Sequence, residues 1–365
     1  MSARTRMRNR SAVAIALAVT AGVALLTGCD PEPAGSAAPG ASASATAAAR
    51  PASPSVASTA TAPAPVTPTA KPSASASASK PAGATPTGTA AAANGTAGNG
   101  LTISNGTQYV LMNGGQVDFG TAVRDLAWSP DGSKAAFVSG SGDLVVSNPD
   151  GSGRVVVAKN PGGQTWSHPT WQVAPAEDQY RIPAKNNIIF AAVKDGVSRL
   201  ERVAATAQGG TPEQIALNTM SDPDVKPLPA TGNTWPSGGG KVGAAVYANS
   251  DTGEVYIRDE YLRQQGSSLG KGSQPAMSPD GEEIVFVRSV GGHDHVFEVD
   301  HTGKDAKDLT PNATTDYTEP AFSPDGRTIA VRTPGGIATL PAHGGAAPVQ
   351  VSTSAGLPAY RAGKH

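Results

Sequence analysis

Three copies of the segment Ser-Pro-Asp-Gly restrict this chain to a small set of folds. The copies occupy 129–132, 278–281 and 323–326, and each follows a bulky apolar residue: Trp128, Met277 or Phe322. Each also precedes a short β-type run rich in Val, Ile and Phe. Pro pre-sets φ, and Asp and Gly suit the later positions of a turn, so each copy predicts a reversal between two strands. Repeats of this kind with short strands are typical of the blades of a β-propeller.

Two degenerate copies fill the gap between the first two clear ones. Trp171 precedes the β-type run 188–191, and Trp235 precedes the run 242–246. The bulky anchors then recur roughly every 43 residues, as propeller blades do, with one longer interval. The additional residues in that longer interval predict insertions in 172–186 and 217–232.

The two ends of the repeat region complete a sixth unit. Tyr360, within 358–363, resembles an anchor, and the strands that this unit lacks would lie in 101–119. Because no helical period occurs in the region, we expect an all-β fold, a six-bladed β-propeller of four-stranded antiparallel blades over 101–365. Five blades remain the alternative, since the sixth depends on Tyr360 and short N-terminal strands.

The repeat also resembles a known family. The pattern Pro-Ala-(Trp/Phe)-Ser-Pro-Asp-Gly, a Val/Ile-Phe strand, Asp-x-Val and a final Leu-Thr closely resembles TolB-like (WD40-like) propeller repeats, and 275–326 is the best copy. The resemblance implies a six-bladed propeller. It implies no particular activity, because such propellers serve as periplasmic binding scaffolds and as gating domains of some serine peptidases.

The first residues have the character of an export signal. Residues 1–10 carry four Arg and no acid, and 12–26 are almost entirely apolar, as in a secretory signal peptide. Leu26-Thr-Gly-Cys29 resembles the lipobox of bacterial lipoproteins, which implies cleavage after residue 28 and a lipid on Cys29, the only Cys of the chain. An uncleaved anchor helix or an ordinary signal peptide is the alternative. The expected location is the outer face of the cytoplasmic membrane, and Asp30 resembles a signal for retention there.

Residues 29–100 have the composition of a flexible tether. Ala, Ser, Pro, Thr and Gly dominate, and too few large apolar residues are present to offset the entropy of ordering the chain. We therefore expect three segments: a lipoprotein signal peptide at 1–28, a lipidated and disordered linker at 29–100, and the propeller at 101–365.

The innermost strands predict a candidate binding site. In a propeller these strands line the central channel, so the residue three before each anchor should recur around it. These residues are Asp125, His168, Gly232, Gln274, Glu319 and Leu357. Asp125, His168, Gln274 and Glu319 are polar or ionisable, and we expect them to bind a ligand or ion at the channel mouth or merely to hydrate it.

Two further motifs point to chemistry but lack the required context. Gly266-Ser-Ser268-Leu-Gly270 fits Gly-x-Ser-x-Gly, but a nucleophile elbow needs an α/β sheet, so we expect an exposed blade connection. His293 and His295 form a His-x-His pair whose only nearby third ligand is His301, so we expect an exposed turn. The sequence thus predicts no catalytic residue, no metal site and no cofactor.

These features favour binding over catalysis. The formal net charge is −1, but residues 1–28 hold four Arg and no acid, so the rest of the chain has 24 basic and 29 acidic residues, a net of −5, which argues against nucleic acid as a partner. We expect a monomeric, non-enzymatic scaffold for an envelope protein or peptide, with the insertions as contact loops. Small-molecule or ion sensing in the channel is the alternative, and an accessory domain of a hydrolase is a weaker one.

Overall fold

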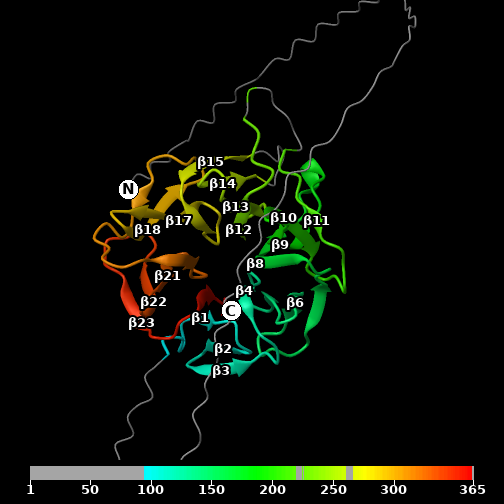
Figure 1. Ribbon diagram of the computed structural model, residues 1–365, viewed down its shortest axis with the longest axis horizontal. Coiled ribbons are helices and arrows are strands. Elements are labelled where there is room, and N and C mark those ends of the chain that lie inside the picture. The colour runs from blue at the N-terminus through cyan, green and yellow to red at the C-terminus, as the bar shows by residue number, and fades with distance from the viewer. Residues whose placement is uncertain (1–93, 219–223, 225, 260–265, 364–365) are drawn as a thin grey trace, which may run out of the picture. The chain divides into compact units, whose positions relative to one another are not determined.

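The computed structural model contains six four-stranded antiparallel sheets arranged around a central axis (Figure 1). It describes residues 94–218, 224, 226–259 and 266–363. The signal peptide and Cys29 lie outside the described residues, as does 30–93 of the tether. The six-bladed propeller predicted from the repeats is confirmed.

The blades are numbered by the order of their innermost strands along the chain. Blade 1 consists of β4 (Arg124–Trp128), β5 (Ala135–Val138), β6 (Leu144–Ser147) and β7 (Val155–Ala158). Blade 2 consists of β8 (Gln164–Ala174), β9 (Lys185–Lys194), β10 (Val197–Ala204) and β11 (Glu213–Gln214). Blade 3 consists of β12 (Asn233–Gly239), β13 (Ala244–Asn249), β14 (Glu254–Arg258) and β15 (Gly266–Lys271). Blade 4 consists of β16 (Ser273–Met277), β17 (Glu283–Val290), β18 (His293–Asp300) and β19 (Lys307–Asp308). Blade 5 consists of β20 (Thr318–Phe322), β21 (Thr328–Thr333), β22 (Gly336–Pro341) and β23 (Val349–Ser352). Blade 6 consists of β24 (Leu357–Tyr360), β1 (Leu101–Ser104), β2 (Tyr109–Met112) and β3 (Gly115–Asp118). The only helix in the described chain is one 3-10 turn, η1 (Asp178–Tyr180), and no helix there is long and apolar enough to cross a membrane.

The Ser-Pro-Asp-Gly segments form the turns that the sequence predicts. In blade 1 the Ser129 hydroxyl donates to Asp131 and accepts from the Lys134 amide, 2.9 Å away. The corresponding Ser and Asp make the same bonds in blades 4 and 5. Because the turn satisfies its own polar groups, it can reverse the innermost strand without help from neighbouring blades.

Apolar side chains between neighbouring sheets hold the ring together. The buried residues form six clusters, and each fills the space between one pair of adjacent blades. Phe286, which is fully buried, packs in the cluster between blades 3 and 4. The smallest cluster lies between blades 5 and 6, with only four buried members: Leu101, Ile103, Ala330 and Ile337. A cavity of about 800 Å³ adjoins this same interface.

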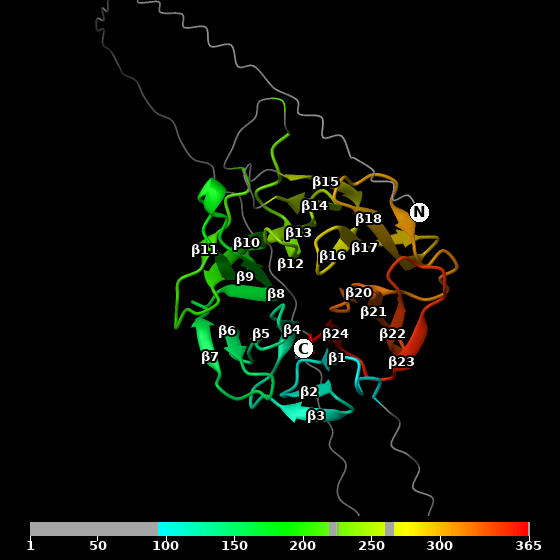
Figure 2. The ribbon, with the colours of Figure 1, turned by 180° about the vertical axis from the view of Figure 1, so that it is seen from behind.

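Blade 6 joins the two ends of the described chain. β24 supplies its innermost strand and pairs antiparallel with β1, so the red and cyan ends of the ribbon meet (Figure 2). Beyond β24, the Arg361 amide donates to the Gly100 carbonyl at 2.8 Å, and its side chain donates to Gly132 in the first turn of blade 1. The Arg361 guanidinium also lies 5.4 Å from the ring centre of Trp128. The predicted split unit is therefore confirmed.

The boundary between tether and propeller differs from the prediction. Residues 94–100, which we assigned to the tether, pack on blade 6 with Thr96 completely buried. The Thr96 hydroxyl accepts a hydrogen bond from the Gly114 amide at 2.9 Å. Composition could not reveal this, because small polar residues are equally common in linkers and in tightly packed turns.

Candidate functional site

The six innermost strands converge on a central channel. In five of them the ladder to the second strand shifts register at the same place, which is a β-bulge. At each bulge one residue has a left-handed backbone, with φ between 49° and 54°: Asp125, His168, Trp235, Gln274 and Glu319. Leu357 takes the equivalent place in blade 6, and we call these six residues the channel ring. Left-handed non-Gly residues are uncommon and concentrate at functional sites, because they cost free energy that the fold must offset.

The prediction for blade 3 was wrong by three residues. The repeat spacing predicts Trp235 as an anchor and Gly232 as its ring residue, but Trp235 itself lies in the channel ring and Gly238 takes the anchor position. A large anchor would not fit there, since a Cβ on Gly238 would collide with the carbonyl of Trp171. The missed signal is the Pro that follows the ring residue in five blades, here Pro236.

The channel ring lies between two cavities. A turn-side cavity of about 380 Å³ is lined by all six innermost strands and by Pro residues of the Ser-Pro-Asp-Gly turns. A far-side cavity of about 350 Å³ is lined by the opposite ends of blades 1, 2, 5 and 6. Asp125, His168, Glu319 and Leu357 line both cavities. The predicted site residues are therefore brought together, but within the channel rather than at its mouth.

Hydrogen bonds and ring contacts connect the ring residues across the blades. The Asp125 carboxylate accepts from the His168 amide at 3.0 Å, and the Gln274 side chain accepts from the Glu319 amide at 2.7 Å. The imidazole of His168 lies against the indole of Trp235, with ring centres 3.5 Å apart and ring planes tilted by 35°. These contacts fix the side chains before any ligand arrives, which reduces the entropy cost of binding.

Two polar atoms of the ring are buried without a partner in the described protein. They are Nδ1 of His168 and Oε2 of Glu319. Burial lowers the pKa of His168, although Asp125 opposes the shift, so the imidazole is neutral at pH 7. Burial raises the pKa of Glu319, while Arg332, 2.9 Å away, opposes the shift. Buried polar atoms are normally satisfied, and these two are closed to solvent, so a group in the channel would bond to them only after a small rotation of either side chain.

The predicted insertion 172–186 forms an extended hairpin beside the channel. The β8–β9 pairing continues for three residue pairs beyond Trp171, to Ala174 and Lys185. At about 3.3 Å per residue this adds roughly 10 Å to the blade. Val173 lines the turn-side cavity and is 39% exposed, and Tyr180 nearer the tip is 47% exposed. The other insertion, 217–232, connects β11 with β12 and is described only in part.

Ser268 does not lie in a nucleophile elbow. The Gly-x-Ser-x-Gly segment forms β15, the outermost strand of blade 3, rather than the connection that we expected. The Ser268 hydroxyl donates to Glu254 at 3.1 Å, and the same carboxylate accepts from Tyr256 and pairs with Lys271. This hydroxyl therefore has a carboxylate rather than an imidazole as its acceptor, unlike the serine of a catalytic triad.

The His-x-His segment is a strand and not an exposed turn. His293 and His295 both belong to β18, and His295 is only 4% exposed. Their Nδ1 atoms contact different carboxylates, Asp316 at 3.3 Å and Asp308 at 2.8 Å. The two histidines therefore have separate roles and do not share a ligand. The sequence predicts a turn that enters the third strand, whereas both residues already belong to that strand, and the sequence could not indicate that His295 is buried beside Asp308 of β19.

Several solved structures are similar to this chain at low sequence identity. No family model matches the chain. A putative TolB from Agrobacterium tumefaciens is 18% identical over 69% of this chain and 87% of that chain, with a TM-score of 0.49. TolB from Acinetobacter baumannii is 18% identical over 72% of this chain and 65% of that chain, with a TM-score of 0.48. An oligogalacturonate lyase in complex with manganese is 12% identical over 64% of this chain and 68% of that chain, with a TM-score of 0.42. Two of these similar structures are TolB proteins, the family that the repeats resemble.

Proposed function

We propose that this chain is a lipid-anchored scaffold that binds an envelope protein through the turn-side cavity and the β8–β9 hairpin. The lipid is on Cys29, and 30–93 serves as the tether that holds the propeller away from the outer face of the cytoplasmic membrane. The propeller is a non-enzymatic monomer in this proposal.

The position of Val173 is the observation that carries the proposal. Its side chain belongs both to the wall of a 380 Å³ cavity and to the exposed surface of a hairpin that extends past the other blades. A small molecule would fill the cavity without needing the hairpin. A protein segment that enters the cavity would also contact the hairpin, where Tyr180 offers the kind of aromatic surface that protein interfaces favour.

The channel ring gives such a partner a specific point of recognition. Trp128, Trp171 and Phe322 supply apolar walls to the turn-side cavity, and His168 and Glu319 supply the unpartnered polar atoms at its base. A partner side chain that pairs with these atoms gains the hydrogen bonds that the unbound protein lacks. A partner with an apolar group in the same place would leave them buried and unpaired, so the ring discriminates between partners.

A site-specific cross-linking experiment tests the proposal. A photoreactive amino acid at position 173 of the full-length protein, irradiated in its native membranes, should give one dominant adduct. Position 349 is the matched control, since Val349 is 63% exposed on the outer strand β23, away from the channel. Removing 175–184 from the hairpin should abolish the adduct at 173. If positions 173 and 349 gave the same adducts, or if position 173 gave none, a specific partner at the turn-side cavity would be refuted.

Anchoring and location have a separate test. Cys29→Ser should move the protein from the membrane fraction to the soluble extracytoplasmic fraction, whereas Ser36→Ala in the tether should leave it in the membrane. Retention of the Cys29→Ser protein in the membrane would favour an uncleaved anchor helix.

Binding of a small molecule or ion in the channel is the second candidate function. The unpartnered Nδ1 of His168 and Oε2 of Glu319 favour it, because both residues line the two channel cavities and neither belongs to the hairpin. A ligand at a hundredfold excess over its Kd should stabilise the protein by about 2.7 kcal/mol. Glu319→Gln should reduce this stabilisation, and deletion of 175–184 should leave it unchanged.

A further inference from the structure

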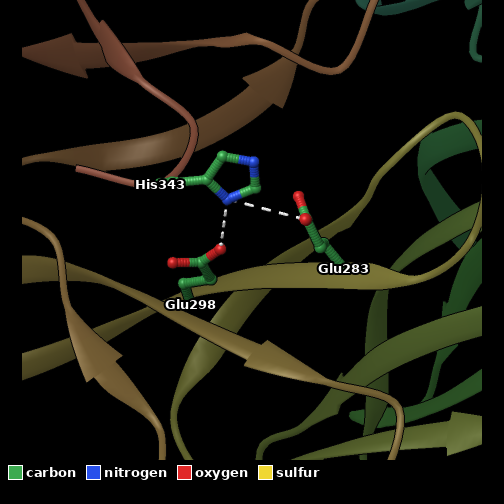
Figure 3. Close-up of side chains that lie close together, drawn as sticks. All are labelled: Glu283, Glu298 and His343. Carbon is green, nitrogen blue, oxygen red and sulfur yellow. Dashed lines mark hydrogen bonds and ion pairs between the residues drawn. The ribbon is translucent and has the colours of Figure 1, made fainter.

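A cluster of three potential metal ligands lies outside the channel, where blades 4 and 5 meet. Glu283 begins β17, Glu298 lies on β18, and His343 follows β22 of the next blade. The three side chains point toward one another from three separate elements (Figure 3). Their sequence spacing follows no metal-binding motif, so the cluster could not be found before the fold was known.

One imidazole nitrogen lies opposite both carboxylates. Nδ1 of His343 is 2.8 Å from Oε1 of Glu298 and 3.5 Å from Oε1 of Glu283. One donor atom from each residue can be chosen so that all three lie within 4.8 Å of one another. In a tetrahedral zinc site with bonds of about 2.0–2.2 Å, neighbouring ligand atoms are roughly 3.3–3.5 Å apart. The 3.5 Å separation from Glu283 matches this spacing, and the 2.8 Å contact with Glu298 is a hydrogen bond that must lengthen by about 0.5 Å when an ion replaces its proton.

The charges around the cluster can accommodate a cation in place of the proton on the His343 imidazole, because metal ligands bind in their deprotonated form. Two carboxylates oppose a single imidazole, and Glu298 is largely buried, with 16% of its side chain exposed. Lys307 lies to one side, 3.9 Å from Oε2 of Glu298, and donates to the His343 carbonyl at 2.6 Å. Lys307 thereby holds the His343 loop against blade 4 while leaving Oε1 of Glu298 directed at the imidazole. Such contacts from outside the ligand set orient ligands in known metal sites.

We propose that Glu283, Glu298 and His343 bind one divalent transition-metal ion of the zinc class, which bridges blades 4 and 5. One imidazole and two carboxylates suit Zn²⁺ better than Mg²⁺, which prefers oxygen ligands in octahedral geometry. With three protein ligands, the fourth position is left to water or to a group from another molecule. Because the ligands come from two blades, the bound ion resists separation of those blades.

Zinc titration of the full-length protein tests this site. Isothermal titration with Zn²⁺ should give one site per chain, and Mg²⁺ at the same concentration should give no heat above dilution. At a hundredfold excess of Zn²⁺ over Kd, the melting temperature should rise by about 5–10 °C for a domain of this size. His343→Asn should weaken binding more than about 100-fold, since even residues outside the ligand set contribute about 10–100-fold.

His293→Asn is the matched control. His293 is another partly exposed imidazole beside a carboxylate, Asp316, but it has no second carboxylate in contact. This variant should bind Zn²⁺ like the unaltered protein, and Glu283→Gln should weaken binding as a second variant if His343→Asn fails to fold. Equal zinc affinity in His343→Asn and His293→Asn, no zinc binding at all, or tighter binding of Mg²⁺ than of Zn²⁺ would each overturn the proposal.

Discussion

Removal of β24 and the residues after it should open the propeller, because this segment supplies the innermost strand of blade 6. The variant ends at Gly356 and lacks Leu357–Tyr360 and everything after them. Its matched control ends at Gly363, which keeps β24 and the contacts of Arg361. Both variants leave blades 1 to 5 and strands β1 to β3 intact.

The structure allows the loss to be estimated. β24 and β1 pair over four residues, which corresponds to about four hydrogen bonds at roughly 1 kcal/mol each. Arg361 adds bonds to Gly100 and Gly132, or about 2 kcal/mol. Partial exposure of Leu101 and Ile103, both almost fully buried, costs about 2 kcal/mol more. The sum of about 8 kcal/mol is as large as the whole net stability of many domains, about 5–15 kcal/mol.

Urea and thermal unfolding of the two truncated proteins, followed by circular dichroism, measure the effect. The variant that ends at Gly356 should melt more than about 15 °C below the control, and its urea midpoint should fall accordingly. Limited proteolysis should cut blade 6 first. A melting temperature within about 1 °C of the control would refute the reasoning, because the ring would then be closed by something other than β24.

Three further outcomes follow from individual side chains. Burial depresses the pKa of His168 below 6.5, so the free energy of unfolding should decrease as pH falls from 6.5 through the lowered pKa. In His168→Gln the free energy of unfolding, measured with urea, should depend less on pH over that range. Phe286→Ala should cost about 3–5 kcal/mol in urea unfolding, whereas Val349→Ala, at an exposed position, should change stability by less than about 0.5 kcal/mol. Gly132→Ala should destabilise more than Gly326→Ala by calorimetry: both residues have positive φ in the same type of turn, but only a Cβ on Gly132 meets the carbonyl of Ala362. Equal effects at the two glycines would contradict the contact between the C-terminal segment and blade 1.

The sequence predicted the fold because the repeat is local. Each Ser-Pro-Asp-Gly turn satisfies its own hydrogen bonds, so its structure can be inferred from four residues without knowledge of the neighbours. The split blade was also predictable, since Tyr360 and the strands near the N-terminus fill the one place that the repeat left incomplete. The anchor of blade 3 was harder to predict, because Gly238 stands where the other blades have a bulky residue. Trp235, three residues earlier, has the size expected of an anchor.

The residues of the candidate sites also divide into those that the sequence could predict and those that it could not. Asp125, His168, Gln274 and Glu319 could be predicted, because a fixed position in a repeat maps to a fixed height in the channel. The partner-free Nδ1 of His168 could not, since it depends on the adjacent Trp235 from the next blade. Glu283, Glu298 and His343 could not either, because contacts between blades combine residues whose spacing in the chain is arbitrary.

The pairing of β24 with β1 has a consequence for how the gene could be rearranged. Covalent continuity ends inside blade 6, yet the Arg361 amide still reaches the Gly100 carbonyl at 2.8 Å, so the described chain returns almost to where it began. A short peptide could therefore join the two ends, and new termini could be opened at the exposed Gly162–Gly163 turn between blades 1 and 2. Such a circular permutant would make blade 6 covalently continuous and leave no blade split between the chain ends, so the ring would be closed by the packing of blade 1 on blade 2 without altering any sheet.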